Sequence, residues 1–249
     1  MVAGTDSKPS TNLLPRGAFM PTIIFASPKG GVGKSTSALV LATELAGRGA
    51  NVAVIDADPN KPLSRWAARP GRPDKLTVQA DVREDTIIDA IETAERQTQF
   101  VIVDLEGTAN MLVAYAMSRA DLVIIPCQGS QLDAAEAVKA IKLVKRQEKA
   151  FTRTIPCAVL FTRTSAAIGT RDLKDIQAQL AEAGVQTFTK QMVERAAFRA
   201  LFSYGGMLGG LDPSQVSNID AAKRNATAFA HEVVQLLKSH GKPLQRKVA

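Results

Sequence analysis

Residues 28–36 read Pro-Lys-Gly-Gly-Val-Gly-Lys-Ser-Thr, so two lysines, three glycines and two hydroxyl side chains fall within nine positions. Glycines let a backbone pass close to an anion with its N–H groups pointing inward. The apolar run 22–27 predicts a strand before this turn, and 35–48 predicts a helix after it, whose positive N-terminal end favours an anion. A strand, a glycine-rich turn and a helix start in this order indicate a phosphate-binding loop.

The last side chains of this loop have distinct expected roles. Lys34 would reach the β- and γ-phosphates of a nucleotide, and the Ser35 hydroxyl would ligate Mg²⁺. The first position of the common phosphate-loop pattern is Pro28 instead of glycine, and an additional lysine follows it. A glycine-rich turn that binds no ligand is the alternative. The nucleotide-binding residues expected here are Lys29, Gly30, Gly31, Val32, Gly33, Lys34, Ser35 and Thr36.

Carboxylates follow the next two long apolar runs. Asp56 and Asp58 come at the end of 51–56 with a spacing of two, which points both side chains the same way along an extended chain. At a Mg²⁺–nucleotide site such a pair can hold metal-bound water and orient an attacking water. Asp104 ends the run 100–104. The alternatives are an Asp-Pro-Asn turn at the first place and a simple strand end at the second.

These segments together resemble the ParA/MinD family of ATPases. Residues 29–36 resemble its deviant Walker A motif, and 56–59 resemble its switch I. The run 101–104 resembles a Walker B strand that leads into switch II at Gly107. Two positions depart from the family pattern, because Asn60 stands where Gln is frequent and Glu106 where many members have Pro.

The resemblance implies a role for each of these residues. Lys29 would reach across a nucleotide-sandwich homodimer to the partner's phosphates, and Asp58 would activate water, so that Lys29, Lys34 and Asp58 form the catalytic set. Ser35, Asp56 and Asp104 would lie at Mg²⁺, and the Gly107 N–H would turn to the γ-phosphate. Without an Asn-Lys-x-Asp signature, ATP is expected over GTP, with base contacts from 160–164 and about 190–193.

The remaining chain predicts a doubly wound α/β sheet, mostly parallel and flanked by helices, of the P-loop NTPase type. Apolar runs that suit strands buried on both faces alternate with segments of good helix formers. We expect one domain over 21–240, a disordered tail over 1–20 and a basic tail over 241–249. The expected strands are 22–27, 51–56, 76–80, 100–104, 121–126 and 154–162, and the expected helices are 35–48, 84–96, 109–119, 131–149 and 171–183.

The C-terminal part is expected to differ from this alternation. A short helix over 193–202 precedes a flexible glycine-rich loop, 205–210. A final amphipathic helix, with Pro213 near its start, carries an apolar stripe from 219 to 237 that would dock on the sheet.

Composition limits the function classes. The formal net charge of +7 favours polyanionic partners. No apolar run approaches the roughly 20 residues that span a bilayer, and the N-terminus lacks the apolar core of a secretory signal. Cys127 and Cys157 have no metal-type spacing and read as buried free thiols in a reducing cytoplasm.

Two groups of cations are candidates for binding DNA. One is the helix 131–149 with Lys139, Lys142, Arg146 and Lys149 along one stripe. A solvated helix face is the alternative for this stripe. The other group is C-terminal, with ordinary surface charge as its alternative, and consists of Arg195, Arg199, Lys223, Arg224, Lys238, Lys242, Arg246 and Lys247.

The resemblance is strongest to small ParA-type partition proteins without an N-terminal helix-turn-helix domain, including the ParA-like protein of T-DNA transfer. It implies a slow, Mg²⁺-dependent ATP hydrolase that dimerises on ATP and binds double-stranded DNA non-specifically at the nucleoid. A ParB-like partner would stimulate it. The alternatives are a MinD-like ATPase that positions membrane-bound or clustered proteins, and metabolic relatives. The C-terminal stretch 239–249 is basic and contains Gly and Pro, which argues against an amphipathic membrane anchor.

Overall fold

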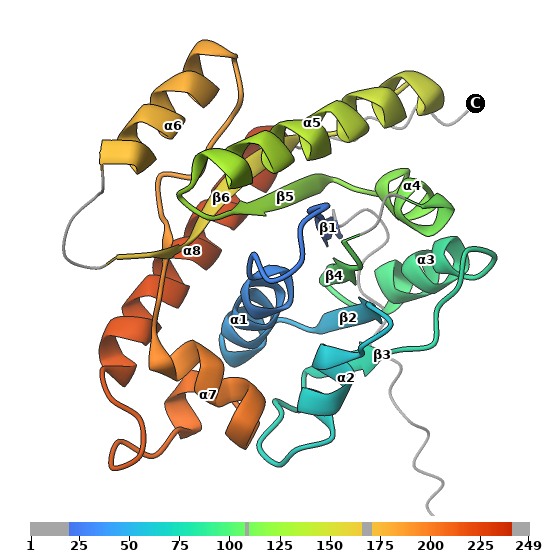
Figure 1. The fold of residues 1–249 in the computed structure, drawn as a ribbon. Coiled ribbons are helices and arrows are strands. Elements are labelled where there is room, and N and C mark those ends of the chain that lie inside the picture. Colours follow the sequence, from blue (N-terminus) through green and yellow to red (C-terminus); the bar gives the residue numbers. More distant parts are fainter. Residues whose placement is uncertain (1–19, 108–109, 166–170, 241–249) are drawn as a thin grey trace, which may run out of the picture.

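The computed structural model describes residues 20–107, 110–165 and 171–240. They form a seven-stranded sheet in the order β3-β2-β4-β1-β5-β6-β7, and all strand pairs are parallel (Figure 1). This confirms the doubly wound α/β prediction. The strands are β1 Thr22–Phe25, β2 Val52–Ala57, β3 Leu76–Gln79, β4 Phe100–Leu105, β5 Leu122–Cys127, β6 Cys157–Thr164 and β7 Met192–Val193.

The strand order places the phosphate loop at the middle of the sheet. The central strand β1 lies between β4 and β5, and the chain leaves its carboxyl end into the loop. Ligands of open α/β sheets bind outside the carboxyl ends of strands where the winding direction reverses. The strands that carry Asp56, Asp104 and the base-side segment 160–164 all end at this same edge.

Helices cover both faces of the sheet, and each face has its own hydrophobic cluster. One cluster includes Ile23 and Phe25, and the other includes Ile24 and Ala26, as expected for a strand buried on both sides. The first face is covered by α1 Lys34–Gly47, α2 Pro62–Ala67, α7 Ala196–Tyr204 and α8 Ile219–His240. The second is covered by α3 Ile87–Gln97, α4 Met111–Met117, α5 Gln131–Phe151 and α6 Arg171–Glu182.

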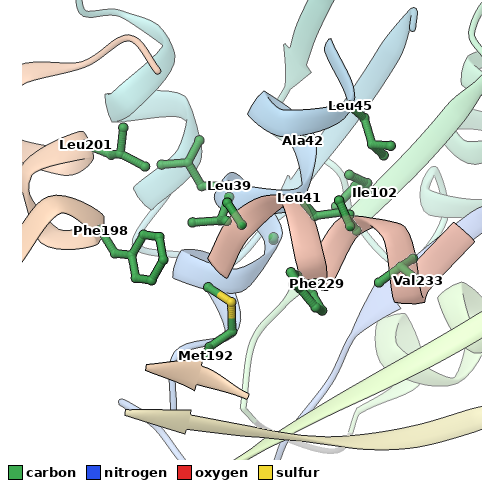
Figure 2. Packing of buried hydrophobic residues seen from close by; sticks show 14 of the residues in the cluster. Leu39, Leu41, Ala42, Leu45, Ile102, Met192, Phe198, Leu201, Phe229 and Val233 are labelled. Carbon is green, nitrogen blue, oxygen red and sulfur yellow. The ribbon is translucent and has the colours of Figure 1, made fainter. Parts of the chain in front are cut away.

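Helix α1 is enclosed between the sheet and the C-terminal helices. Leu39 and Leu41 are almost fully buried, and Figure 2 shows them close to Phe198 of α7 and Phe229 of α8. A helix that is apolar on nearly all sides is a core helix. The first turn of α1 is the end of the phosphate loop, so the loop is attached to one of the most buried parts of the molecule.

Four sequence predictions for the chain after the first strand need correction. Helix α2 was not expected, because six residues are too few to show a helical period. Strand β7 lies at 192–193, where a loop was expected, and α8 begins at Ile219, six residues after Pro213. In the glycine-rich stretch 205–210, Gly205, Gly206 and Leu208 are buried, and the stretch ends in a short 3₁₀ turn, Leu208–Gly210, whose two glycines are exposed.

The packing of that stretch predicts a large effect of a small substitution. Gly205 has φ +83°, and a Cβ atom there would lie 2.5 Å from the Arg69 Cβ and 2.8 Å from the Pro70 carbonyl oxygen. We expect Gly205→Ala to lower the free energy of unfolding by about 2–4 kcal/mol, because backbone strain and overpacking add. Urea denaturation measures the change.

Gly209→Ala is the matched control, because a Cβ atom at Gly209 would meet nothing within 4 Å and its φ is not positive. We expect its unfolding free energy to stay within about 0.5 kcal/mol of the unsubstituted chain. Equal stabilities of the two variants would contradict the packing described here.

Candidate nucleotide-binding site

The phosphate loop uses backbone conformations that favour glycine. Gly31 and Gly33 have φ of +74° and +92°, in the left-handed region that favours glycine. Gly30 and Gly31 are exposed, and a Cβ atom on either would meet nothing within 4 Å, so the tip of the loop is open to solvent. Gly33 caps α1, and the Ser37 N–H donates to its carbonyl over 2.9 Å. The N-terminal end of α1 therefore faces the cradle.

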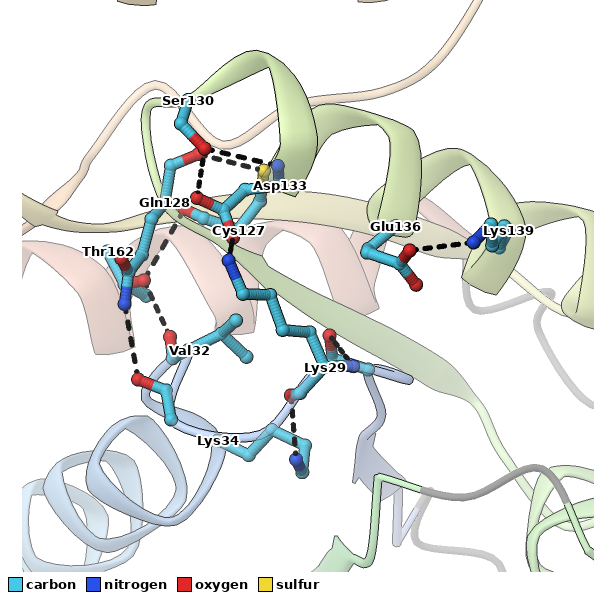
Figure 3. Close-up of polar contacts among 12 residues, drawn as sticks. Lys29, Val32, Lys34, Cys127, Gln128, Ser130, Asp133, Glu136, Lys139 and Thr162 are labelled. Carbon is cyan, nitrogen blue, oxygen red and sulfur yellow. Dashed lines mark hydrogen bonds and ion pairs between the residues drawn. The ribbon is translucent and has the colours of Figure 1, made fainter.

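Side chains from neighbouring strand ends hold the loop in place. The Thr162 hydroxyl, on β6, donates to the Val32 carbonyl over 2.7 Å, and the Gln128 amide, after β5, donates to the Gly31 carbonyl over 3.2 Å. The buried Lys34 folds back and donates to the Lys29 carbonyl over 3.4 Å (Figure 3). The cradle is thus preformed by contacts within the chain.

Asp56 and Asp104 lie side by side at the ends of adjacent strands, since they are register partners of β2 and β4. Asp104 is fully buried, and among the described residues neither of its carboxylate oxygens has a donor at hydrogen-bond geometry, although the Ser35 hydroxyl is near enough to lower its pKa. The Asp56 Oδ1 atom is also buried without a partner in the described ranges. Three unsatisfied acceptor oxygens at one place are costly unless a ligand supplies charge or donors.

Burial sets the charge state of this pair. It raises the pKa of Asp104 to about 7, and the charges of Asp56 and Asp58 add to the rise, while the Ser35 hydroxyl and the Lys34 ammonium oppose it. Burial also raises the pKa of Asp56, which Ser64 lowers in part by hydrogen bonding. Oxygen ligands of this kind suit Mg²⁺. Among the described residues, no group of three or more His, Cys, Asp or Glu side chains could hold a metal ion by itself.

Ser64 is a site residue that the sequence reasoning missed. Its backbone N–H and its hydroxyl donate to the Asp56 Oδ2 atom over 2.7 and 2.8 Å. One Asp56 oxygen is therefore held by the protein while the other stays free. Ser64 lies in the first turn of α2, so the unpredicted helix is what brings it to the site. No sequence signal beyond its position eight residues after Asp56 pointed to this contact.

Lys29 is paired within its own chain. Its ammonium forms an ion pair with Asp133, whose side chain is only 3% exposed at the start of α5 (Figure 3). Ser130 caps α5 by accepting from the Asp133 N–H over 3.2 Å, and its hydroxyl also donates to the Asp133 carboxylate. Burial alone would raise the pKa of Asp133, but the hydrogen bonds from Lys29 and Ser130 outweigh it and lower that pKa. Asp133 was not among the expected site residues.

The two switch segments flank this centre. Asp58 accepts from the Asn60 N–H over 2.8 Å, so the Asp-Pro-Asn turn that was the alternative interpretation is present and uses one carboxylate oxygen. A Cβ atom on Gly107 would lie 3.1 Å from the Pro28 carbonyl oxygen, so this close approach of switch II to the phosphate loop favours glycine. The geometry brings Lys34, Asp56, Asp58 and Asp104 together but holds Lys29 on the α5 side.

The two segments expected near a base meet in one cavity beside Gly33 and Thr36. It is lined from β6 by Thr162 and Arg163 and from β7 onward by residues 192–195, 198 and 199. The Arg195 Nε atom is buried there without a partner among the residues that the structure describes. The expected base-side segments thus converge next to the phosphate loop, and Arg195 and Arg199 lie with them.

The remaining cations of the C-terminal DNA prediction do not form one patch. Lys223 and Arg224 lie in the first two turns of α8, and Lys238 lies in its last turn. Fourteen or fifteen residues of helix separate them by about 20 Å. Lys223 is 3.5 Å from Asp220, and Arg199 is paired with Glu194. Lys242, Arg246 and Lys247 lie outside the described residues.

The alternative stripe on α5 borders a cavity of about 330 Å³. Lys139, Lys142 and Arg146 form one side, and Ser27, Pro28 and Gly107 lie on the side of the nucleotide site. Lys139 is paired with Glu136 over 2.7 Å.

Within the described ranges, no helix is both long and apolar enough to cross a membrane.

Comparison with known proteins identifies the class. The family model described as VirC1 protein matches residues 20–245, and the chain belongs to this family of ParA-like P-loop ATPases. It is 42% identical over 218 residues to a Protein ParA of Rhizobium radiobacter, and the match covers 88% of this chain and 98% of that protein.

Two solved structures share the fold. An ATP complex of a McdA variant from Cyanothece superposes with a TM-score of 0.71 at 17% identity, covering 88% of this chain and 98% of that one. The cell division ATPase MinD of Pyrococcus furiosus gives a TM-score of 0.68 at 16% identity over 88% and 100% of the two chains. Both confirm the ParA/MinD architecture.

The unpaired carboxylates yield a prediction for Asp104→Asn. Removing the charge should leave the melting temperature of the metal-free protein unchanged or higher, because a buried unpaired charge is removed. The same variant should lose the extra stabilisation that Mg²⁺ adds to ATP, measured by thermal unfolding with ATP in EDTA and in Mg²⁺.

Asp74→Asn is the control and should keep the Mg²⁺ increment, because Asp74 is exposed and lies just before β3, at the edge of the sheet opposite the carboxyl ends that carry Asp56 and Asp104. An Asp104→Asn protein that gained as much from Mg²⁺ as the unsubstituted chain would refute a metal site at Asp104.

Proposed function

We propose that this protein is a Mg²⁺-dependent ATP hydrolase that dimerises on ATP, binds double-stranded DNA without sequence preference and positions a DNA cargo. The observation that carries the proposal is the preformed phosphate cradle, with two lysines, opposite the unsatisfied carboxylates of Asp56 and Asp104. The name Protein ParA of its 42% identical relative supports a partition role. A nucleoid location and stimulation by a ParB-like partner belong to the same proposal.

The residues of this chain divide the work of hydrolysis. Backbone N–H groups of 30–36 bind the phosphates, and Lys34 neutralises charge on the β- and γ-phosphates. Ser35, Asp56 and Asp104 would hold Mg²⁺, directly or through water, and the ion would neutralise charge that develops on the γ-phosphate oxygens. Asp58 orients the attacking water for in-line displacement. The carboxylate oxygen that Asp58 does not use in its turn is available for this.

The second lysine makes the reaction depend on dimerisation. Lys29 of the partner subunit would complete the charge around the γ-phosphate across the dimer interface. In the single chain, Lys29 is held by the buried Asp133, so it must leave this ion pair to act in trans. Slow turnover follows, because a site completed by a second copy is not assembled in the monomer.

Lys29→Ala tests the proposal. We expect ATP binding to remain within about tenfold of the unsubstituted chain, because Lys34 and the cradle are intact. ATP hydrolysis, ATP-dependent dimerisation and ATP-dependent binding to a random-sequence duplex should fall by at least about 100-fold in rate or to background. Phosphate release, light scattering and fluorescence anisotropy measure the three.

Lys145→Ala, which removes an exposed lysine of α5, is the control and should behave like the unsubstituted chain. Normal ATPase activity in Lys29→Ala would exclude the trans-lysine role. An unsubstituted chain that hydrolyses ATP but binds no duplex in any nucleotide state would remove DNA from the proposal and leave the ATPase.

Asp133→Asn should release Lys29 without removing it. The amide keeps an acceptor for Ser130 but no longer neutralises the ammonium, so the in-chain pair weakens. We expect ATP-dependent dimerisation at about two- to tenfold lower protein concentration. Sedimentation across a concentration series measures it. Dimerisation that required more protein than the unsubstituted chain would show that Asp133 supports the dimer instead of restraining Lys29.

A further inference from the structure

A group of cations outside the nucleotide site and outside both expected DNA patches lies on α2 and on the segment that connects it to β3. The stretch 61–75 contains five cations and one acid, Asp74. Lys61 is paired with Asp81 at the site side. The other four, Arg65, Arg69, Arg72 and Lys75, are exposed, and we call them the cationic corner.

Most of the charge of the corner is not neutralised within the chain. Arg65, Arg69 and Arg72 have no carboxylate within 4.0 Å in the part of the chain that the structure describes, and Lys75 donates to the Gly49 carbonyl over 2.9 Å. Of the earlier candidates, Arg199 and Lys223 have acidic partners, whereas three of the four cations of the α5 stripe also have none among the described residues. The corner is distinguished from that stripe by its three arginines and by the fixed backbone described next. Unpaired arginines held together by the fold repel one another, and an external polyanion relieves this repulsion.

The backbone that carries these arginines is fixed. Trp66 is 1% exposed, and its indole N–H donates to the Gly206 carbonyl over 3.1 Å. A Cβ atom on Gly71 would lie 3.1 Å from the Gly206 Cα atom, so the two segments touch backbone to backbone. Figure 1 shows α2 beside α7, which leads into Gly205 and Gly206. A rigid base lowers the entropic cost of ordering the arginines on a ligand.

The chemistry of the corner favours nucleic-acid phosphates over a lipid surface. Guanidinium groups bind phosphate oxygens in a bidentate manner, and three of them fall within eight residues. Stable binding to a lipid surface would need large apolar side chains that insert. The exposed large hydrophobic residues of the described chain are Met111, Leu132, Phe151 and Tyr204. Of these, Tyr204 is the one near the corner, because it precedes Gly205, which packs against Arg69.

We propose that the cationic corner is a contact surface for the phosphate backbone of duplex DNA. The inference rests on the DNA binding in the proposed function and assigns it to residues of α2 and its following segment. Arg65 directly follows Ser64, whose N–H and hydroxyl hold Asp56, so the same short helix touches both the nucleotide site and this surface.

The test compares two full-length variants with equal loss of charge. One carries Arg65→Gln, Arg69→Gln and Arg72→Gln, and the other carries Arg96→Gln, Lys145→Gln and Lys174→Gln on the opposite face of the sheet. Fluorescence anisotropy with a random-sequence duplex of about 24 base pairs is measured in ATP and in ADP over a salt series. Melting temperature and ATP binding confirm that both variants are folded.

We expect the corner variant to bind at least about tenfold more weakly at about 100 mM salt, with the control within about twofold of the unsubstituted chain. The plot of log K against log salt should become less steep by about 0.9 for each phosphate that the variant no longer neutralises. Loss of three contacts would make it less steep by about 2.7. An Arg→Lys triple variant should recover the salt slope, because lysine keeps the charge, but only part of the affinity, because lysine cannot bind phosphate in a bidentate manner.

Other outcomes overturn the inference in distinguishable ways. Equal affinity of the corner and control variants, with normal binding by the unsubstituted chain, would exclude the corner and leave the proposed function intact. Absence of duplex binding by the unsubstituted chain in every nucleotide state would exclude both. Sedimentation of the unsubstituted chain, but not of the corner variant, with vesicles of anionic phospholipid in place of DNA would assign the corner to a membrane and overturn its assignment to DNA.

Discussion

The burial of α1 is the constraint on which the rest of the site depends. Its apolar residues are enclosed between the sheet and the helices α7 and α8, so its position is set by two layers of core. The phosphate loop runs from the central strand into the first turn of this helix, and Thr162 and Gln128 fix its outer carbonyls. Because both ends of the loop are anchored, its N–H groups are oriented before any anion arrives, and little entropy is lost on binding.

Buried carboxylates lie beside the cradle, whose N–H groups and lysines favour anions, so the ligand-free site holds groups of both charge signs. Asp56 and Asp104 lie where adjacent strands end, and burial keeps the pKa of Asp104 at about 7. The unsatisfied oxygens make the ligand-free site costly. A bound divalent cation would neutralise the aspartates, and bound phosphate would neutralise the lysine. Ser64 lessens this cost on one side of Asp56, which leaves the other oxygen free for a ligand.

The sequence was enough for the first six strands, the site-bearing strand ends and the start of α1, because buried parallel strands are continuous apolar runs and glycine-rich turns require special backbone angles. It was not enough for α2, Ser64 or Asp133. A six-residue helix has no period to detect, and the Asp133 pair joins residues 104 positions apart with no local signal. The C-terminal cations illustrate the same limit, because charge that is clustered in sequence is divided by a 22-residue helix and partly neutralised by neighbours.

The two unpredicted contacts place the control of the site at its borders. On one side, Asp133 at the start of α5 holds Lys29; on the other, Ser64 at the start of α2 holds Asp56. Ser64 and Asp133 belong to the first turns of α2 and α5, where unpaired N–H groups favour negative charge. The Asp56 carboxylate at the start of α2 and the Asp133 carboxylate in α5 are therefore stabilised by these helix ends as well as by their hydrogen bonds. Under the proposed function, Lys29 leaves its ion pair with Asp133 to reach the partner's phosphates, and a cation beside Asp56 competes with the hydrogen bonds from Ser64. Each of these contacts would then have to weaken or rearrange when the site is filled, and each belongs to the first turn of a helix that carries cations.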